Sequence, residues 1–164
     1  MTIEQSWETI VSVVPANPPA TDEDLAHVAE VIGAPLPDDI VASLKIHDGI
    51  DVETVNDAMR EGKELPFGGW IMSCRDIATD WAGWKGVYDA ENDEWNDRWW
   101  TPNLVPLVSD GGGNSVCVDL TTGQLMNMDH ELGPLEYEFK TWAEYLAAVA
   151  ANAESGAEVA VYWT

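Results

Sequence analysis

The residues best suited to chemistry gather around one glycine-rich turn and the hairpin that follows it. The turn runs from Asp110 through three glycines to Asn114, and backbone N–H groups of a glycine-rich loop can cradle a phosphate. A phosphate-binding loop also needs a lysine and a following helix, whereas this turn has no lysine and leads into a strand pattern. We interpret its glycines as giving left-handed turn geometry, with Asp110 and Asn114 bonded to the local backbone.

The same hairpin carries side chains that could hold a hard cation. Oxygen ligands grouped near one turn are what such ions prefer. The sequence has neither the spacing of an EF-hand loop nor an HExxH motif. We therefore predict no metal and no other cofactor, although four residues are candidate ligands: Asp110, Asp119, Asp129 and His130.

Nucleophilic catalysis is also poorly supported. Ser109, Ser115 and Cys117 lack a motif such as GxSxG, and the three histidines are too scattered to suggest a triad. Cys117 lies between two valines, which is typical of an inert strand residue rather than a reactive thiol. We predict no catalytic residues and no enzyme.

A tryptophan-rich acidic segment gives a sharper hypothesis. Aromatic side chains surrounded by charge are typical of tight protein interfaces, where an indole fills a pocket and carboxylates pair with basic groups. The alternative is that these tryptophans pack beneath their own loop, because aromatic residues are more often buried than displayed. The candidate partner-binding residues are Asp93, Glu94, Trp95, Asp97, Trp99 and Trp100.

The charge of the chain narrows the choice of partner. Its 164 residues contain seven Lys+Arg and thirty Asp+Glu, for a net charge of -23. Such a surface repels phosphate backbones and anionic lipid, which argues against nucleic acid and membranes as partners. The acidity could steer a basic protein towards this one, or it could serve general solubility or a saline cytoplasm. Composition alone does not decide between these two explanations of the acidity, and it does not give the oligomeric state.

Length and termini complete the broad classification. A chain of 164 residues is one ordinary domain with a real core. No apolar run approaches the ~20 residues of a membrane-spanning helix, and residues 1–5 lack the positive region of a signal peptide. Two cysteines are too few for a disulfide framework. We expect a soluble cytoplasmic protein.

Helix signals dominate the first third of the chain. Apolar residues at helical spacing predict a helix from residue 3 to about 14. Thr21 is placed as the N-cap of a second helix and Gly33 as its C-terminal cap, and Pro37 opens a third. Residues 50–68 are expected to form a loop, and residues 74–88 a helix with Val87 on its apolar side.

Strand signals follow. Short strands are predicted at 70–72 and at 104–108, the second interrupted at Pro106, then a hairpin over 116–129 whose first strand is half-buried. A helix begins near Phe139, and residues 158–163 are a candidate final strand. This order predicts an α+β domain with a mostly antiparallel or mixed sheet and helices packed on one side.

Five segments in this order resemble the SUKH superfamily, the relatives of the yeast cell-wall assembly regulator and killer-toxin resistance proteins. They are residues 32–39, 44–49, 106–114, 116–125 and the helix from Phe139, with His130 and Glu131 at a further matching position. The family-motif residues, expected to be structural, are Gly33, Leu36, Pro37, Gly49, Pro106, Asp110, Gly113, Asn114, Asp119 and Gly123. Residue 40 departs from the pattern, being Ile where an aromatic is common.

The resemblance implies a non-enzymatic binding protein. Many bacterial members look like immunity proteins that neutralise a toxin domain by binding it, whereas the eukaryotic relatives look like regulatory scaffolds. It also implies one SUKH-like core over residues 20–152, within a single domain of residues 1–164. A helix and proline-rich connector (1–19) precede this core and a C-terminal extension (153–164) follows it.

Overall fold

The described residues of this computed structural model are 1–61, 69–90, 99–153 and 155, and they form six helices and five strands. The helices are α1 (Ile3–Ile10), α2 (Asp22–Ile32), α3 (Asp38–Leu44), α4 (Val52–Arg60), α5 (Cys74–Ala90) and α7 (Trp142–Ala153). The strands are β1 (Trp70–Ile71), β2 (Leu104–Ser109), β3 (Ser115–Asp119), β4 (Leu125–Asp129) and β5 (Gly133–Glu136). The predicted α+β class is confirmed.

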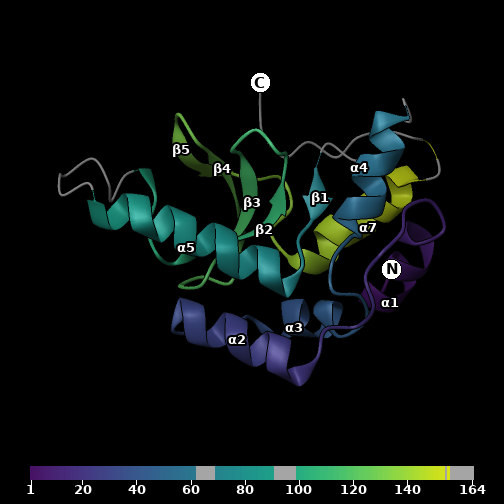
Figure 1. Ribbon diagram of the computed structural model, residues 1–164, viewed down its shortest axis with the longest axis horizontal. Coiled ribbons are helices and arrows are strands. Elements are labelled where there is room, and N and C mark those ends of the chain that lie inside the picture. Colours follow the sequence, from purple (N-terminus) through teal and green to yellow (C-terminus); the bar gives the residue numbers. More distant parts are fainter. Residues whose placement is uncertain (62–68, 91–98, 154, 156–164) are drawn as a thin grey trace.

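The strands form one antiparallel sheet in the order β1-β2-β3-β4-β5, so each strand pairs with its neighbours in sequence. Figure 1 shows α5 crossing in front of the sheet, with α2 and α3 beneath it and α1, α4 and α7 at the other end of the molecule. The register shifts between Pro106 and Val108, as a bulge that accommodates a proline in an interior strand.

The prediction that the first strand of the hairpin is half-buried is wrong. Every residue from Ser115 to Val118 is buried, and so is every residue of β2 from Leu104 to Val108. Successive side chains of a strand point to opposite faces, so both faces of these strands are covered. α5 packs against β2 and so covers one of these faces.

The predicted caps are confirmed. The Thr21 side chain accepts a hydrogen bond from the Asp24 N–H, and the Asp24 carboxylate accepts one from the Thr21 backbone N–H, which completes a capping box. Gly33 ends α2 in the left-handed conformation at φ 80°. The same reciprocal pattern joins Thr2 and Gln5 at the start of α1.

Two expectations about element boundaries are corrected. Residues 52–60, expected in a loop, form α4, because Asp51 caps the helix by accepting hydrogen bonds from the Thr54 N–H and hydroxyl and Val55 is buried. The last helix begins at Trp142 rather than Phe139, because Thr141 accepts a hydrogen bond from the Glu144 N–H. Strand β5 was not predicted, and the expected strand at 158–163 lies outside the described residues.

The N-terminal helix belongs to the same packed unit as the rest. α1 packs on α7 and α3, and its Trp7 is buried with the indole N–H donating to the Ser43 hydroxyl at 2.9 Å. Val14 is also buried, whereas Val87 of α5, expected on the apolar side, is exposed. Among the described helices, none has both the length and the apolarity to span a bilayer.

Candidate protein-binding site

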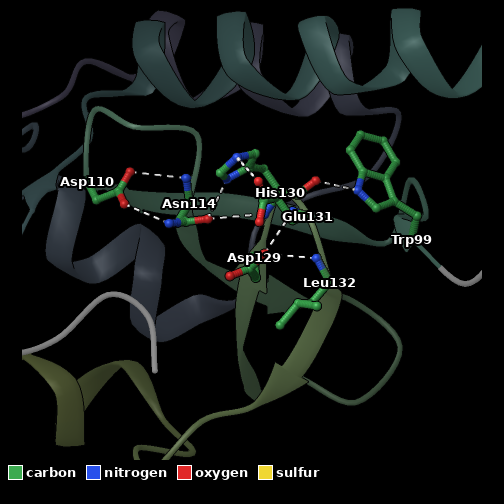
Figure 2. A network of polar contacts seen from close by, with 7 residues as sticks. All are labelled: Trp99, Asp110, Asn114, Asp129, His130, Glu131 and Leu132. Atoms are coloured by element: carbon green, nitrogen blue, oxygen red, sulfur yellow. Dashed lines mark hydrogen bonds and ion pairs between the residues drawn. The ribbon is translucent and has the colours of Figure 1, made fainter. Parts of the chain in front are cut away.

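Of the six predicted interface residues, the structure describes Trp99 and Trp100, and of these two Trp99 lies at the surface. Its side chain is half-buried, and its indole N–H donates a hydrogen bond of 2.8 Å to the backbone carbonyl of His130. Its ring lies 4.9 Å from that of Trp84 on α5, tilted by 57°. Trp99 therefore forms an aromatic pair with Trp84 of α5, and Figure 2 shows its indole bonded to the β4–β5 turn.

Trp100 does not belong to this surface. Its side chain is fully buried, with ring centroids 6.2 Å from Trp81 and 5.8 Å from Tyr88. The prediction that Trp100 contacts a partner is therefore wrong, because burial among other aromatic rings removes it from contact. Asp93, Glu94, Trp95 and Asp97 lie outside the described residues.

Beside Trp99, a polar network locks the glycine-rich turn to the β4–β5 turn (Figure 2). The Asn114 amide donates to Asp110 Oδ2 at 2.9 Å, and its Oδ1 faces His130 N at 3.1 Å and His130 Nδ1 at 2.9 Å. A carboxylate only accepts, so Asp110 fixes the orientation of the Asn114 amide. His130 therefore donates from Nδ1, and its Nε2 lies 3.9 Å from Glu131 Oε1.

Asp129 holds the β4–β5 turn from within. One carboxylate oxygen accepts hydrogen bonds from the backbone N–H groups of Glu131 at 2.7 Å and Leu132 at 2.8 Å. These bonds, the one from Leu132 first, lower the pKa of Asp129. The turn presents Leu132, which is 69% exposed. We call Trp84, Val87, Trp99, His130 and Leu132 the aromatic face.

A hollow adjoins the aromatic face. It has a volume of about 400 Å³ and lies between α5 and the glycine-rich turn, with Asp80, Trp84 and Val87 on one side and Ser109, Gly111 and Gly113 on the other. At Gly113, which lines this hollow, the φ of 105° excludes most side chains. A Cβ built there would also lie 3.3 Å from the His130 ring. The arrangement can accept protruding side chains from another molecule.

The cysteine and serine side chains considered for nucleophilic catalysis are buried or make hydrogen bonds within the fold. Cys74 and Cys117 are buried, and burial raises the pKa of both thiols, that of Cys117 to about 12. The Ser115 hydroxyl lies 3.3 Å from Cys117 Sγ, and the Ser109 hydroxyl accepts the Gly111 N–H. Within residues 1–61, 69–90, 99–153 and 155, no group of three or more His, Cys, Asp or Glu could hold a metal ion.

The family-motif residues lie at turns and caps. Asp110 accepts the N–H groups of Gly112 and Asn114, and Asp119 accepts the N–H and hydroxyl of Thr121. Gly49 has φ 72° and touches the Met72 backbone so closely that a Cβ would lie 2.6 Å from it. The others are Gly33 and Gly123 at positive φ, buried Leu36, Pro37 at the start of α3 and Pro106 at the bulge of β2.

Comparison with known proteins decides the family. The sequence model of the SMI1 / KNR4 family (SUKH-1) matches residues 19–148. The chain belongs to this family. The SUKH-1 match includes every element from α2 to β5 and the first half of α7, so the resemblance inferred from the motifs is confirmed.

Two proteins are similar in sequence to this SUKH-1 protein. The glucan synthesis regulatory protein of Neurospora crassa is 24% identical over 216 residues, with 94% of this chain and 39% of that protein covered. A prophage-derived uncharacterized protein of Bacillus subtilis is 29% identical over 130 residues, with 73% of this chain and 67% of the relative covered. The chain thus spans well under half the length of the fungal relative.

Sequence reasoning missed part of the aromatic face. Trp84, on the helix predicted over residues 74–88, was not among the candidate partner-binding residues, yet it is half-buried and pairs with Trp99. Its neighbours on α5 carried a usable signal, because Gly83 and Gly86 bracket it and bulky core-facing stretches of a helix seldom contain two glycines. The acidic pair Asp76 and Asp80, four residues apart on α5, was also passed over.

Proposed function

We propose that this SUKH-1 protein is a non-enzymatic immunity protein that neutralises a toxin domain by direct, stoichiometric binding. The observation that carries the proposal is an aromatic face beside uncompensated acidic charge. Two indoles, Trp84 and Trp99, pack 4.9 Å apart at the surface, and the chain as a whole has a net charge of -23. Aromatic anchors with charged surroundings are what high-affinity protein interfaces use.

The charge favours a basic partner. A toxin that acts on nucleic acid must present a positive groove to the phosphate backbone. An acidic protein is complementary to such a groove, and the attraction accelerates encounter at low ionic strength. In this account the protein acts in the cytoplasm, where such a toxin would reach its target, and it binds neither nucleic acid nor membrane.

A regulatory role is the second candidate. It is favoured by the relative named as a glucan synthesis regulatory protein, which aligns with 94% of this chain. In that case the aromatic face would bind a protein of the same cell, and no toxin would be involved.

Co-expression separates the two. The protein is produced together with the C-terminal toxin domain encoded next to its gene, and cell survival is scored for the wild type and for the Asp93/Glu94/Asp97→Lys variant. A Glu8/Glu30/Glu138→Lys variant makes the same charge change at exposed positions elsewhere. Survival with wild type and control but not with the first variant supports immunity at the predicted interface. Death in all three cases argues for the regulatory role.

A further inference from the structure

The hollow beside the aromatic face continues into a second one. The second has a volume of about 250 Å³ and is lined by Trp70, Met72, Asp76 and Val52, and both hollows share Asp80 and Ser109. Together they form one groove along α5, with α5 on one side and β1, the start of α4 and the glycine-rich turn on the other. We call this the α5 groove.

Two carboxylates of α5 line the α5 groove without a cation. Asp76 and Asp80 are one helical turn apart, so they share a helix face. Neither makes a hydrogen bond or an ion pair through its carboxylate with any residue in the described part of the chain. Burial, and then the charge of Asp76, raises the pKa of Asp80. The α5 groove therefore holds negative charge that no described residue compensates.

Nearby cations do not serve these acids. Lys85 of α5 pairs with Asp89, and Arg60 of α4 pairs with Asp57. Arg75, although adjacent in sequence to Asp76, is exposed, and neighbouring positions of a helix point about 100° apart. Among the residues that the structure describes, no lysine or arginine pairs with Asp76 or Asp80, which leaves both carboxylates available to a cation of another molecule.

Aromatic walls restrict which cation fits. Trp84 lines the α5 groove at one end and Trp70 at the other, with Asp80 common to both parts. Trp70 is held by the glycine-rich turn, since a Cβ at Gly111 would lie 2.7 Å from its ring. A guanidinium group is planar, stacks on indole faces and can bond two carboxylates at once, whereas an ammonium group is a compact point charge.

We propose that the α5 groove receives an arginine side chain from an exposed loop of a basic partner protein. The guanidinium group lies between the Asp76 and Asp80 carboxylates, and the aliphatic stem lies against Trp84. This deepens the proposed function by assigning part of its interface, and it rests on that function only for the identity of the partner.

The assignment can be tested without the partner. The probe is the peptide acetyl-Gly-Arg-Gly-amide, titrated into isotope-labelled protein while amide chemical shifts are followed by NMR. We expect saturable shifts concentrated at residues 76–84 and 109–113, and about a tenfold loss of affinity, a difference of roughly 1.4 kcal/mol, in the Asp76→Asn/Asp80→Asn variant. That variant should fold, because it removes a repulsion.

Two controls make the result decisive. The Glu8→Gln/Glu138→Gln variant removes the same charge from exposed positions on α1 and before α7, and should bind the peptide as the wild type does. A peptide with citrulline in place of arginine keeps the shape without the charge and should give no localised shifts. Shifts spread over the whole surface, equal losses in both double variants, or equal binding of the citrulline peptide would overturn the assignment.

The toxin domain then separates this inference from the proposed function. Localised arginine-peptide binding without neutralisation of the toxin would keep the groove and reject the immunity role. Neutralisation that is unchanged in Asp76→Asn/Asp80→Asn would keep the immunity role and place the interface away from the groove.

Discussion

The indole N–H of Trp99 and the backbone carbonyl of His130 are joined by a hydrogen bond of 2.8 Å across 31 positions of sequence. This bond connects Trp99 to the β4–β5 turn. The bond between Asn114 and His130 connects the same turn to the glycine-rich turn. The aromatic face is therefore positioned by backbone and polar contacts, before any partner binds.

Replacing Trp99 tests this bond. Trp99→Phe retains a ring beside Trp84 but lacks the N–H donor, so we expect the free energy of unfolding to fall by about 0.5–1.5 kcal/mol. Trp99→Ala should lose roughly 0.5–1.5 kcal/mol more, because the contact between the two rings is also removed. Urea denaturation measures both values, and a Phe variant as stable as the wild type would show that the bond contributes nothing.

The Asn114 amide joins the two turns, so its removal should be costly. Asn114→Ala removes the amide donor to Asp110 Oδ2 and leaves the His130 N–H groups without their acceptor, and we expect a loss of about 2–3 kcal/mol in the free energy of unfolding. Asn114→Asp keeps an acceptor for His130 but places a second carboxylate against Asp110. It should therefore regain stability on acidification, whereas the Ala variant should not. Denaturation at pH 7 and pH 4 distinguishes them.

Substitution by alanine should change the free energy of unfolding in opposite directions at Gly49 and Gly86. A Cβ at Gly49 would meet the Met72 backbone at 2.6 Å, and its φ of 72° disfavours other residues. Gly49→Ala should therefore cost about 3 kcal/mol or more. A Cβ at Gly86, within α5, would meet nothing within 4 Å. Gly86→Ala should stabilise by about 0.5–1 kcal/mol. Thermal unfolding of the two variants checks both signs, and a well-tolerated Gly49→Ala would contradict the tight packing.

Both cysteines should be unreactive in the folded protein. Burial raises the pKa of Cys117 to about 12 and also raises that of Cys74. We expect no labelling by a thiol reagent at pH 8 until denaturant is added. Since the unfolded chain ionises its thiols at lower pH than the folded one, the free energy of unfolding should fall as the pH rises above about 9. Fast labelling of the native protein would contradict the burial of these residues.

The sequence predicted those parts of the fold that depend on local signals. Thr21 with Asp24 and Gly33 specify the ends of α2 because capping involves residues within one turn of each other. Residues 52–60 were missed because their polar composition resembles a loop, and the burial of Val55, which helps to stabilise the helix, depends on the tertiary fold.

The candidate site was predictable only in part. Trp99 was predicted from the tryptophan-rich, acidic composition of its segment. Whether a tryptophan is exposed or buried depends on tertiary packing. Trp99 is half-exposed and the adjacent Trp100 is fully buried. The α5 groove could not have been predicted, because it brings together α5, β1 and the glycine-rich turn, whose proximity only the fold defines.

Titration of purified toxin domain with this protein tests the proposed immunity function most directly. Toxin activity is measured as increasing amounts of the protein are added. We predict that the activity falls linearly and reaches zero at one molecule of protein per molecule of toxin, as expected for tight stoichiometric binding. Activity that persists in excess protein would contradict neutralisation. Complete loss at far less than one equivalent would instead indicate that the protein acts catalytically.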